Sequence, residues 1–163
     1  MKNKQLLTNK QMKEYEKMAK LRRSNIPVKK IIGYTYYYYS RIEKNAIINE
    51  LYRKIIDSYI PGSKIDPMEE IKKDTKYKNI QVIKDVINDK DNLQPLEMYL
   101  NEIGKELKSY LRIANKMIDE YTKAFGRLLY KINKDIREIN KGLLINYNDT
   151  LTNLSDTITD KLE

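Results

Sequence analysis

Apolar residues recur at helical spacing through the first part of the chain and are interrupted by turn residues. Thr8-x-x-Gln11 has the form of a capping box, in which the hydroxyl and the amide each bond a backbone N–H at the start of a helix. The apolar spacing from Met12 to Ala19 then predicts a helix that begins near Thr8 and ends before a turn at Ser24-Asn25.

Two further helices are predicted before residue 60. Pro27 fits the first position of a helix, where its missing N–H has no partner to lose. Gly33 is predicted to end this helix, because glycine adopts the positive φ of a helix C-terminus without a steric clash. Thr35 would then cap a third helix that starts at Tyr36 and continues to about Ile60. The predicted buried positions at its start are Tyr39, Ile42 and Ala46.

The clearest break in the chain is Ile60-Pro61-Gly62-Ser63, a run of turn residues. Asp66-Pro67 is predicted to open a short helix, with the carboxylate as its cap. A further amphipathic helix is predicted around Ile80, Ile83 and Ile87, and residues 89–92 form a polar turn.

The most regular pattern is an apolar stripe that begins at Leu96. Its residues follow one another at alternating steps of four and three as far as Leu128. An a/d repeat of this length is typical of a coiled coil, so we predict a long helix that associates with other copies of the chain. The predicted oligomerisation residues are Leu96, Leu100, Ile103, Leu107, Tyr110, Ala114, Met117, Tyr121, Ala124 and Leu128.

The stripe also has a second interpretation. It would be the core of an intramolecular bundle if the helices of residues 67–90 fold back on it. Beyond Leu128, two consecutive steps of four to Ile132 and Ile136 form a stutter, which locally unwinds a supercoil. The polar tail either continues the helix or folds back at a turn over residues 146–149.

No stretch alternates at period two for long enough to predict a strand, so the predicted fold class is all-α. We divide the chain into a tri-helical module over residues 1–60, a linker with short helices over 61–92, and a coiled-coil segment over 93–163.

Several classes of enzyme lack their essential residues. The chain has no cysteine and no histidine, which excludes disulfides, Cys/His zinc sites and catalysis by either side chain. It has no glycine-rich phosphate loop and no Gly-x-Ser-x-Gly. Paired acids such as Glu69-Glu70 and Asp119-Glu120 lie among lysines and are interpreted as solvated helix faces. We expect no enzymatic activity, no metal and no cofactor.

No apolar run approaches the roughly 18 residues that a membrane span requires. The basic N-terminus lacks the apolar core of a signal peptide. We therefore expect a soluble, cytoplasmic protein that has no membrane partner.

Positive charge is concentrated in the first third of the chain. Residues 1–60 hold 14 Lys/Arg and 5 Asp/Glu, a balance of +9, whereas residues 61–163 hold 18 of each. The formal net charge of +9 therefore arises in the N-terminal segment alone. This asymmetry favours a basic surface for a polyanion such as nucleic acid, although a solvated face is the alternative.

Residues 27–42, PVKKIIGYTYYYYSRI, carry a family resemblance. The segment resembles the helix-turn-helix of bacterial and phage DNA-binding proteins, in which a helix, a glycine turn and a second helix follow one another. Lys29 departs from the pattern, because the family usually has a small residue there. The matching positions are Val28 and Ile32 in the first helix, Gly33 and Tyr34 in the turn, and Tyr39 and Ile42 in the second helix.

The resemblance implies that the second helix enters the major groove. Arg41 would pair with guanine, while tyrosine and serine hydroxyls would bond bases or phosphates. The alternative for the tyrosines is packing in the core or in a dimer surface. The candidate base-reading residues are Thr35, Tyr36, Tyr37, Tyr38, Ser40, Arg41 and Lys44. The candidate phosphate-binding residues are Arg22, Arg23, Lys29 and Lys30.

The architecture resembles small phage and plasmid proteins with an N-terminal DNA reader and a C-terminal oligomerising helix. It implies sequence-specific binding of double-stranded DNA, in transcriptional regulation or in plasmid or phage DNA partition and maintenance. Its partners would be double-stranded DNA, further copies of the chain, and another protein bound through the coiled coil. The second hypothesis is a packaging component similar to small terminase subunits, and the third is a scaffolding protein whose basic end binds an acidic partner.

Overall fold

Every element in the described part of the chain is helical, which confirms the predicted all-α fold class. The computed structural model describes residues 8–39 and 41–162, and the side chains of residues 41–43, 144–147 and 155–162 lie outside that description. The helices are α1 (Asn9–Arg22), α2 (Pro27–Tyr39), α3 (Arg41–Ser58), α4 (Pro67–Lys72), α5 (Thr75–Asn88), the 3-10 helix η1 (Lys90–Asn92), α6 (Leu93–Glu102) and α7 (Leu107–Leu162).

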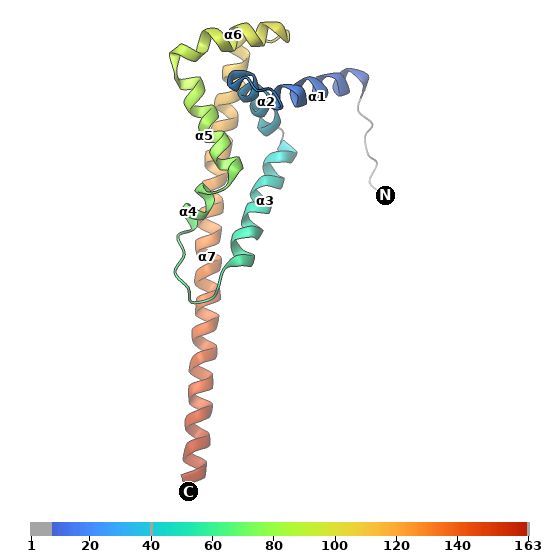
Figure 1. Cartoon of the computed structure of the whole chain (residues 1–163). Helices are drawn as coiled ribbons and strands as arrows, with labels where there is room; N and C mark the ends of the chain where they lie inside the picture. The colour runs from blue at the N-terminus through green and yellow to red at the C-terminus, as the bar shows by residue number, and fades with distance from the viewer. Residues whose placement is uncertain (1–7, 40, 163) are drawn as a thin grey trace.

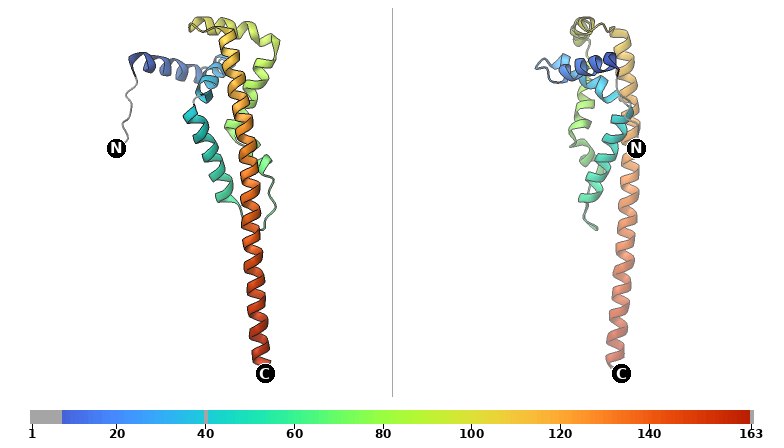
Figure 2. Two further views of the ribbon diagram at one scale, coloured as in Figure 1. Left: turned by 180° about the vertical axis from the view of Figure 1, so that it is seen from behind. Right: turned by 90° about the vertical axis from the view of Figure 1, so that its right-hand side faces the viewer.

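The long helix α7 is the axis of the molecule (Figure 1). Helices α2, α3, α4 and α5 pack along its first half, and α6 lies across its start. α2 is the central helix of this body, because it contacts α1, α3, α5, α6 and α7. The second half of α7 extends beyond the body, away from the other described helices (Figure 2).

The start of α1 follows the sequence prediction. The Thr8 hydroxyl accepts a hydrogen bond from Gln11 N at 3.2 Å, and Gln11 Oε1 accepts one from Thr8 N at 2.9 Å. This capping box satisfies two N–H groups near the helix start that would otherwise lack protein partners. α1 ends at Arg22, and α2 begins at the predicted Pro27.

The predicted end of the second helix at Gly33 is wrong. α2 continues without interruption to Tyr39. Gly33 serves close packing instead, since a Cβ at this position would lie only 2.6 Å from the backbone N of Arg22 in α1. Thr35 therefore caps no helix. It lies inside α2, where its hydroxyl donates to the carbonyl of Ile31 at 2.8 Å.

The third helix begins later than predicted, at Arg41 rather than Tyr36. This shift changes which residues are buried. Tyr39 and Ala46, predicted to be buried, are exposed, and the side chain of Ile42 lies outside the described part. The residues of α3 that enter the core are Ile47, Leu51 and Ile55.

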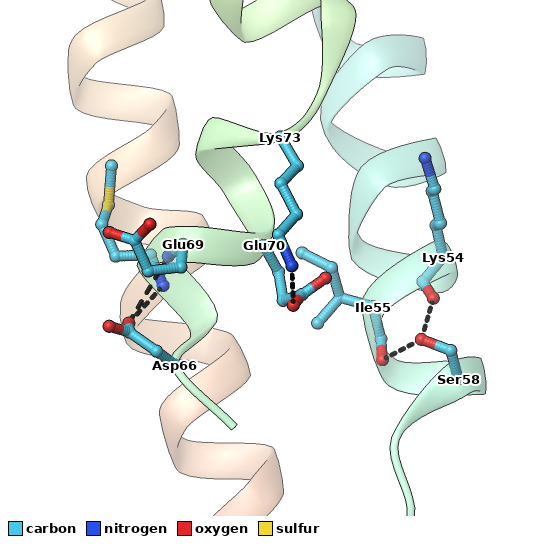
Figure 3. A network of polar contacts seen from close by, with 8 residues as sticks. Lys54, Ile55, Ser58, Asp66, Glu69, Glu70 and Lys73 are labelled. Atoms are coloured by element: carbon cyan, nitrogen blue, oxygen red, sulfur yellow. Dashed lines mark hydrogen bonds and ion pairs between the residues drawn. The ribbon is translucent and has the colours of Figure 1, made fainter. Parts of the chain in front are cut away.

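The predicted break after α3 is confirmed. The Ser58 hydroxyl donates to the carbonyl of Lys54 at 2.8 Å in the last turn of α3 (Figure 3). Gly62 has a φ of 84°, the left-handed conformation that glycine adopts most easily. Its N–H donates to Asn140 Oδ1 on α7 at 3.0 Å. The loop that ends α3 is thus fastened to the middle of the long helix.

The short elements between residues 66 and 92 also follow their predicted signals. The Asp66 carboxylate accepts bonds from the N–H groups of Met68 and Glu69 and caps α4 (Figure 3). α5 buries its predicted stripe, and η1 occupies the predicted polar turn. The stripe residues are Ile80, Ile83 and Ile87.

The single long helix predicted from residue 93 is divided in two. α6 ends at Glu102, and Gly104 follows with a φ of 71°. Gly104 N donates to the carbonyl of Asn101 at 3.1 Å, and Lys105 N donates to that of Leu100 at 2.9 Å. These two bonds form a Schellman motif with Gly104 at C′. The apolar spacing continues across this turn, which is why periodicity alone did not reveal it.

The stripe predicted to drive self-association is covered by the chain itself. Ile103 and Leu107 are half-buried at the turn. The intramolecular alternative is therefore the one that the structure contains, and the predicted oligomerisation surface is not available on these residues. The buried members are Leu96, Leu100, Tyr110, Ala114, Met117, Tyr121, Ala124 and Leu128.

One core runs through all three predicted segments of the chain. It joins Ile32 of α2, Ile83 of α5 and Tyr121 of α7. A fold-back at residues 146–149 does not occur, because α7 continues to Leu162. Within the described ranges, no helix combines the length and apolarity needed to cross a lipid bilayer.

Candidate nucleic-acid interface

Two of the predicted base-reading residues lie inside the body. Thr35 is fully buried in α2, and its hydroxyl lies 2.8 Å from that of Tyr110 in α7. Tyr38 is also buried, and its hydroxyl accepts a hydrogen bond from Asn79 Nδ2 of α5 at 3.0 Å. Because α2 is surrounded by five helices, it presents no continuous face that would fit a DNA groove.

Tyr36 and Tyr37 are half-buried and support the packing of α1. The Arg22 guanidinium lies over the Tyr37 ring, 4.1 Å from its centroid. The Lys105 ammonium lies 5.3 Å from the centroid of the Tyr36 ring. Such cation–π contacts are favourable electrostatically and hold these side chains in place. The packing interpretation of the tyrosines therefore fits their positions.

Two predicted lysines are engaged with acidic residues. Lys29 lies 3.8 Å from Glu102, and Lys44 lies 3.4 Å from Glu120. Both pairs link N-terminal helices to α6 or α7. Ser40 lies outside the described residues, and the side chain of Arg41 does as well, so the predicted guanine contact has no described geometry.

The predicted phosphate-binding residues Arg23 and Lys30 are exposed. Arg23 follows α1 directly, and its Nε donates to the carbonyl of Ala19 at 3.3 Å, which anchors the base of the side chain. Lys30 lies in the first turn of α2. These two cations, unlike Thr35 and Tyr38, remain accessible to a polyanion.

The strongest basic feature is a row of lysines on α1 that the sequence reading missed. The row consists of Lys10, Lys13, Lys17 and Lys20, all exposed. At about 100° per residue, their steps of three, four and three place them within an arc of about 80°. Among the described residues, none of the four forms an ion pair within 4.0 Å. We call these four residues the lysine row.

The lysine row leads into a basic groove at the corner between α1 and α2. The groove has a volume of about 550 Å³, and Lys17 and Lys20 line it together with Arg23 and Lys29. Glu102 is the one carboxylate in its lining. Four cations and one carboxylate give the groove a positive potential, which suits phosphate groups. The helical spacing of lysines was the signal in the sequence that would have found this surface.

An ion pair holds α1 in position beside the start of α7. Glu14 Oε1 lies 2.8 Å from Lys105 Nζ. The hydrogen bond from Lys105 lowers the pKa of the Glu14 carboxyl below its usual value of 4.5, with smaller contributions from Lys17 and Lys10. Glu14 is therefore ionised at neutral pH and paired with Lys105. The lysine row remains on the exposed side of α1.

A second hollow, of about 430 Å³, lies under α1. Its lining includes Tyr36, Tyr37, Arg22 and the Glu14–Lys105 pair, so its charged groups already contact aromatic rings or each other. We interpret this hollow as part of the α1 packing. Among the described residues, no cluster of three acidic residues is arranged to hold a metal ion.

Comparison with known proteins adds no relative: no family model, no curated protein and no solved structure matches this chain. The exposed basic surface of α1 and the corner beside it are therefore the features of the molecule that indicate a function.

Proposed function

We propose that the protein binds double-stranded DNA through its phosphate backbone, using the lysine row and the adjoining groove. The observation that carries this proposal is the exposure, on one face of α1, of four lysines that form no ion pair with any described residue. A helix rises about 1.5 Å per residue, so the row from Lys10 to Lys20 extends over about 15 Å. Duplex DNA carries about one phosphate charge per 1.7 Å of its axis, so this length faces several phosphates.

In this proposal the contacts are mainly electrostatic and do not read base sequence. The tyrosine-rich helix α2 is central to the core, and Thr35 and Tyr38 bond other helices. Lysine ammonium groups on a helix surface act as point charges toward phosphates. A backbone binder of this kind suits partition, maintenance or organisation of DNA better than recognition of a single operator.

The test is the salt dependence of duplex binding by the full-length protein, measured by fluorescence anisotropy. Four phosphate contacts, one for each lysine of the row, predict a negative slope of log affinity against log salt of at least about 3.6 in magnitude, and contacts in the groove would steepen it. Raising the salt from about 50 to about 200 mM should then weaken binding by on the order of 100-fold. Duplexes of equal length but unrelated sequence should bind with similar affinity.

The variant Lys13→Gln/Lys17→Gln should reduce the magnitude of the slope by about 1.8, because two phosphate contacts are lost. The matched control is Lys84→Gln/Lys90→Gln, which removes the same charge from exposed lysines outside α1. Equal effects of the two variants would show that only the net charge matters, and the lysine row would not be the binding site. Substitution is preferred to deletion of the N-terminal helices, because α2 is part of the core.

A second candidate function, an assembly role as a scaffold or a packaging component, is favoured by a different observation. The exposed second half of α7 carries apolar residues, including Leu151 and Leu154. If no duplex binds at physiological salt, the DNA proposal fails and this candidate takes its place. A mass of eight or more subunits would favour a ring-forming packaging component.

A further inference from the structure

The second half of α7 leaves the body of the protein near Asn140. Asn140 Oδ1 accepts hydrogen bonds from the Tyr59 hydroxyl and from Gly62 N, each at 3.0 Å. A Cβ at Gly62 would lie 3.5 Å from Leu143 Cδ2, so the loop after α3 reaches as far as Leu143. The helix then extends alone to Leu162 (Figures 1 and 2). We call residues 143–162 the distal segment.

The distal segment carries an apolar stripe that, beyond the contact of Leu143 with the loop at Gly62, no described part of the chain covers. Leu143, Leu151 and Leu154 are 46%, 46% and 56% exposed. In the sequence, the same series includes Tyr147, Ile158 and Leu162, with steps of four, four, three, four and four. At about 100° per residue, all six positions fall within an arc of about 100°, the width of a helix face that packs against a partner.

The composition of the distal segment makes a partner necessary. From residue 148 to 154, every residue other than the two leucines is Asn, Asp or Thr. These residues are poor helix formers. Most helices in proteins are stabilised by packing of an apolar face rather than by intrinsic propensity. A helix of this composition therefore depends on a second surface that covers Leu151 and Leu154.

We infer that the distal segment pairs with the distal segment of a second copy of the chain, in antiparallel orientation. The steps of the stripe read the same in both directions about the point between Thr152 and Asn153. Antiparallel pairing about that point opposes Leu151 with Leu154 of the second copy. It likewise opposes position 143 with 162 and position 147 with 158. Such a two-fold interface uses one surface twice, as in most homodimers.

The charges along α7 fit this orientation. Residues 127–142 hold five Lys/Arg and two Asp/Glu, a balance of +3, whereas residues 143–163 hold one and four, a balance of −3. In the antiparallel register, position 149 lies opposite position 156, whereas positions 160 and 163 of each copy lie opposite positions 145 and 142 of the other, next to Lys141. Parallel pairing would place each of the four acidic positions of the segment opposite itself. Opposite potentials across an interface favour one orientation over the other.

The edges of the stripe also permit two identical copies to meet. From position 143 to 158, no residue directly beside a stripe position is charged. Like charges at these edges would oppose pairing of identical helices, and none is present. The edges are formed by small or amide residues such as Asn148, Thr150 and Asn153.

The body offers an apolar contact where the end of the second copy would arrive. Ile60 is 70% exposed in the loop after α3. That loop is joined to Asn140 through Gly62. In the antiparallel register, position 162 of the second copy lies opposite position 143, beside this loop. Ile60 is therefore an exposed apolar side chain in the loop that the end of the second copy would approach.

The first test is the mass of the full-length protein over a concentration series, by sedimentation equilibrium. We expect a reversible monomer–dimer equilibrium. Leu151→Asp should weaken the dimer by on the order of 100-fold, because it places a charge at the centre of the seam. Thr152→Asp is the matched control, since it adds the same charge at the next position, outside the stripe, and should leave the equilibrium unchanged.

Both variants should keep the thermal unfolding of the body, because the distal segment lies outside it. Leu154→Asp provides a second disruption at the opposing position and should behave as Leu151→Asp does. A wild-type protein that stays monomeric throughout the series would overturn the inference. So would a dimer that Leu151→Asp and Leu154→Asp leave intact.

The orientation is tested with one nitroxide label, because the chain contains no other cysteine. Gly142→Cys suits this purpose, since a Cβ at Gly142 has no neighbouring atom within 4 Å. In the antiparallel dimer the two labelled positions are separated by about 31 Å along the helices, whereas in a parallel dimer they are about 10 Å apart. The shorter distance would refute the antiparallel pair.

Discussion

The two halves of α7 carry similar apolar stripes but differ in what covers them. In the first half, Tyr110, Met117 and Ile132 are buried against α2, α3, α4 and α5 of the same chain. In the second half, Leu151 and Leu154 are exposed. The comparison teaches that a run of apolar residues at steps of three and four predicts a helix with a face to bury. It does not indicate whether that face meets the same chain or another one.

The largest expected difference between the two halves comes from shortening one buried and one exposed residue of α7. Ile132 is fully buried, so Ile132→Ala should lower the free energy of unfolding by about 2–5 kcal/mol, through lost burial and the cavity left behind. Leu151→Ala, measured in dilute solution where the chain is monomeric, should change it by about 0.5 kcal/mol or less. Urea unfolding measures both. Similar losses for the two variants would contradict the difference between the halves.

A polar pair inside the first half gives the next largest effect. Thr35→Val leaves the buried Tyr110 hydroxyl without its partner and should cost about 1–3 kcal/mol. Tyr110→Phe should cost only about 1 kcal/mol, because Thr35 keeps its bond to Ile31. In the double variant the two costs should not add, since neither polar group is then stranded. Chemical denaturation of the three variants measures this, and simple additivity would argue against the pair.

Substitution by alanine should change stability in opposite directions at two glycines of the predicted long helix. Gly104→Ala forces a side chain into the left-handed conformation in the turn between α6 and α7 and should destabilise the body by about 1–2 kcal/mol. Gly142→Ala lies within the helix in open space and should increase helix stability by up to about 1 kcal/mol. Thermal unfolding followed by circular dichroism distinguishes the two. A stabilising Gly104→Ala would exclude the turn between α6 and α7.

The smallest expected effect concerns the ion pair between α1 and the start of α7. The pKa of Glu14 is lowered in the folded protein by Lys105, so the pair contributes stability above the unfolded value of about 4.5. That contribution is lost as the pH falls through the folded pKa. Because both groups are partly exposed, it should be about 0.5 kcal/mol or less.

The measurement compares the unfolding free energy of the wild type and Glu14→Gln at neutral pH and near pH 3. The difference between the two proteins should be present at neutral pH and vanish in acid. A difference that grows in acid would have the wrong sign for a lowered carboxyl pKa.

Signals from neighbouring residues were sufficient to predict the starts or buried faces of several helices. Thr8 and Asp66 cap helices as predicted, because capping depends on a few neighbouring residues. Pro27 begins α2, since its missing N–H costs nothing there. The stripe of α5 is buried as its periodicity indicated. In each case the interaction lies within one or two turns, so no distant segment changes the outcome.

The candidate site was less predictable. The asymmetry of charge indicated a basic N-terminal surface, and Arg23 and Lys30 are accessible. The helix-turn-helix pattern directed attention to α2, however, and away from the lysine row on α1. The same residues that would line a recognition helix, Thr35 and Tyr38, instead bond Tyr110 and Asn79 across the core. Sequence periodicity identified apolar and aromatic positions, but it did not indicate whether these side chains pack against other helices or face a partner.

Local sequence signals specify an all-helical chain, most of its caps and breaks, and the location of its excess positive charge. The role of Gly33, which permits α1 to approach α2, became evident only from the packing of the two helices. The turn at Gly104 likewise interrupts the helix although the apolar spacing continues across it. Tertiary structure also decided that the first half of α7 is covered by its own chain while the distal segment is not. The physical reason is that caps and periodicity are short-range properties, whereas burial depends on which helices the chain brings together.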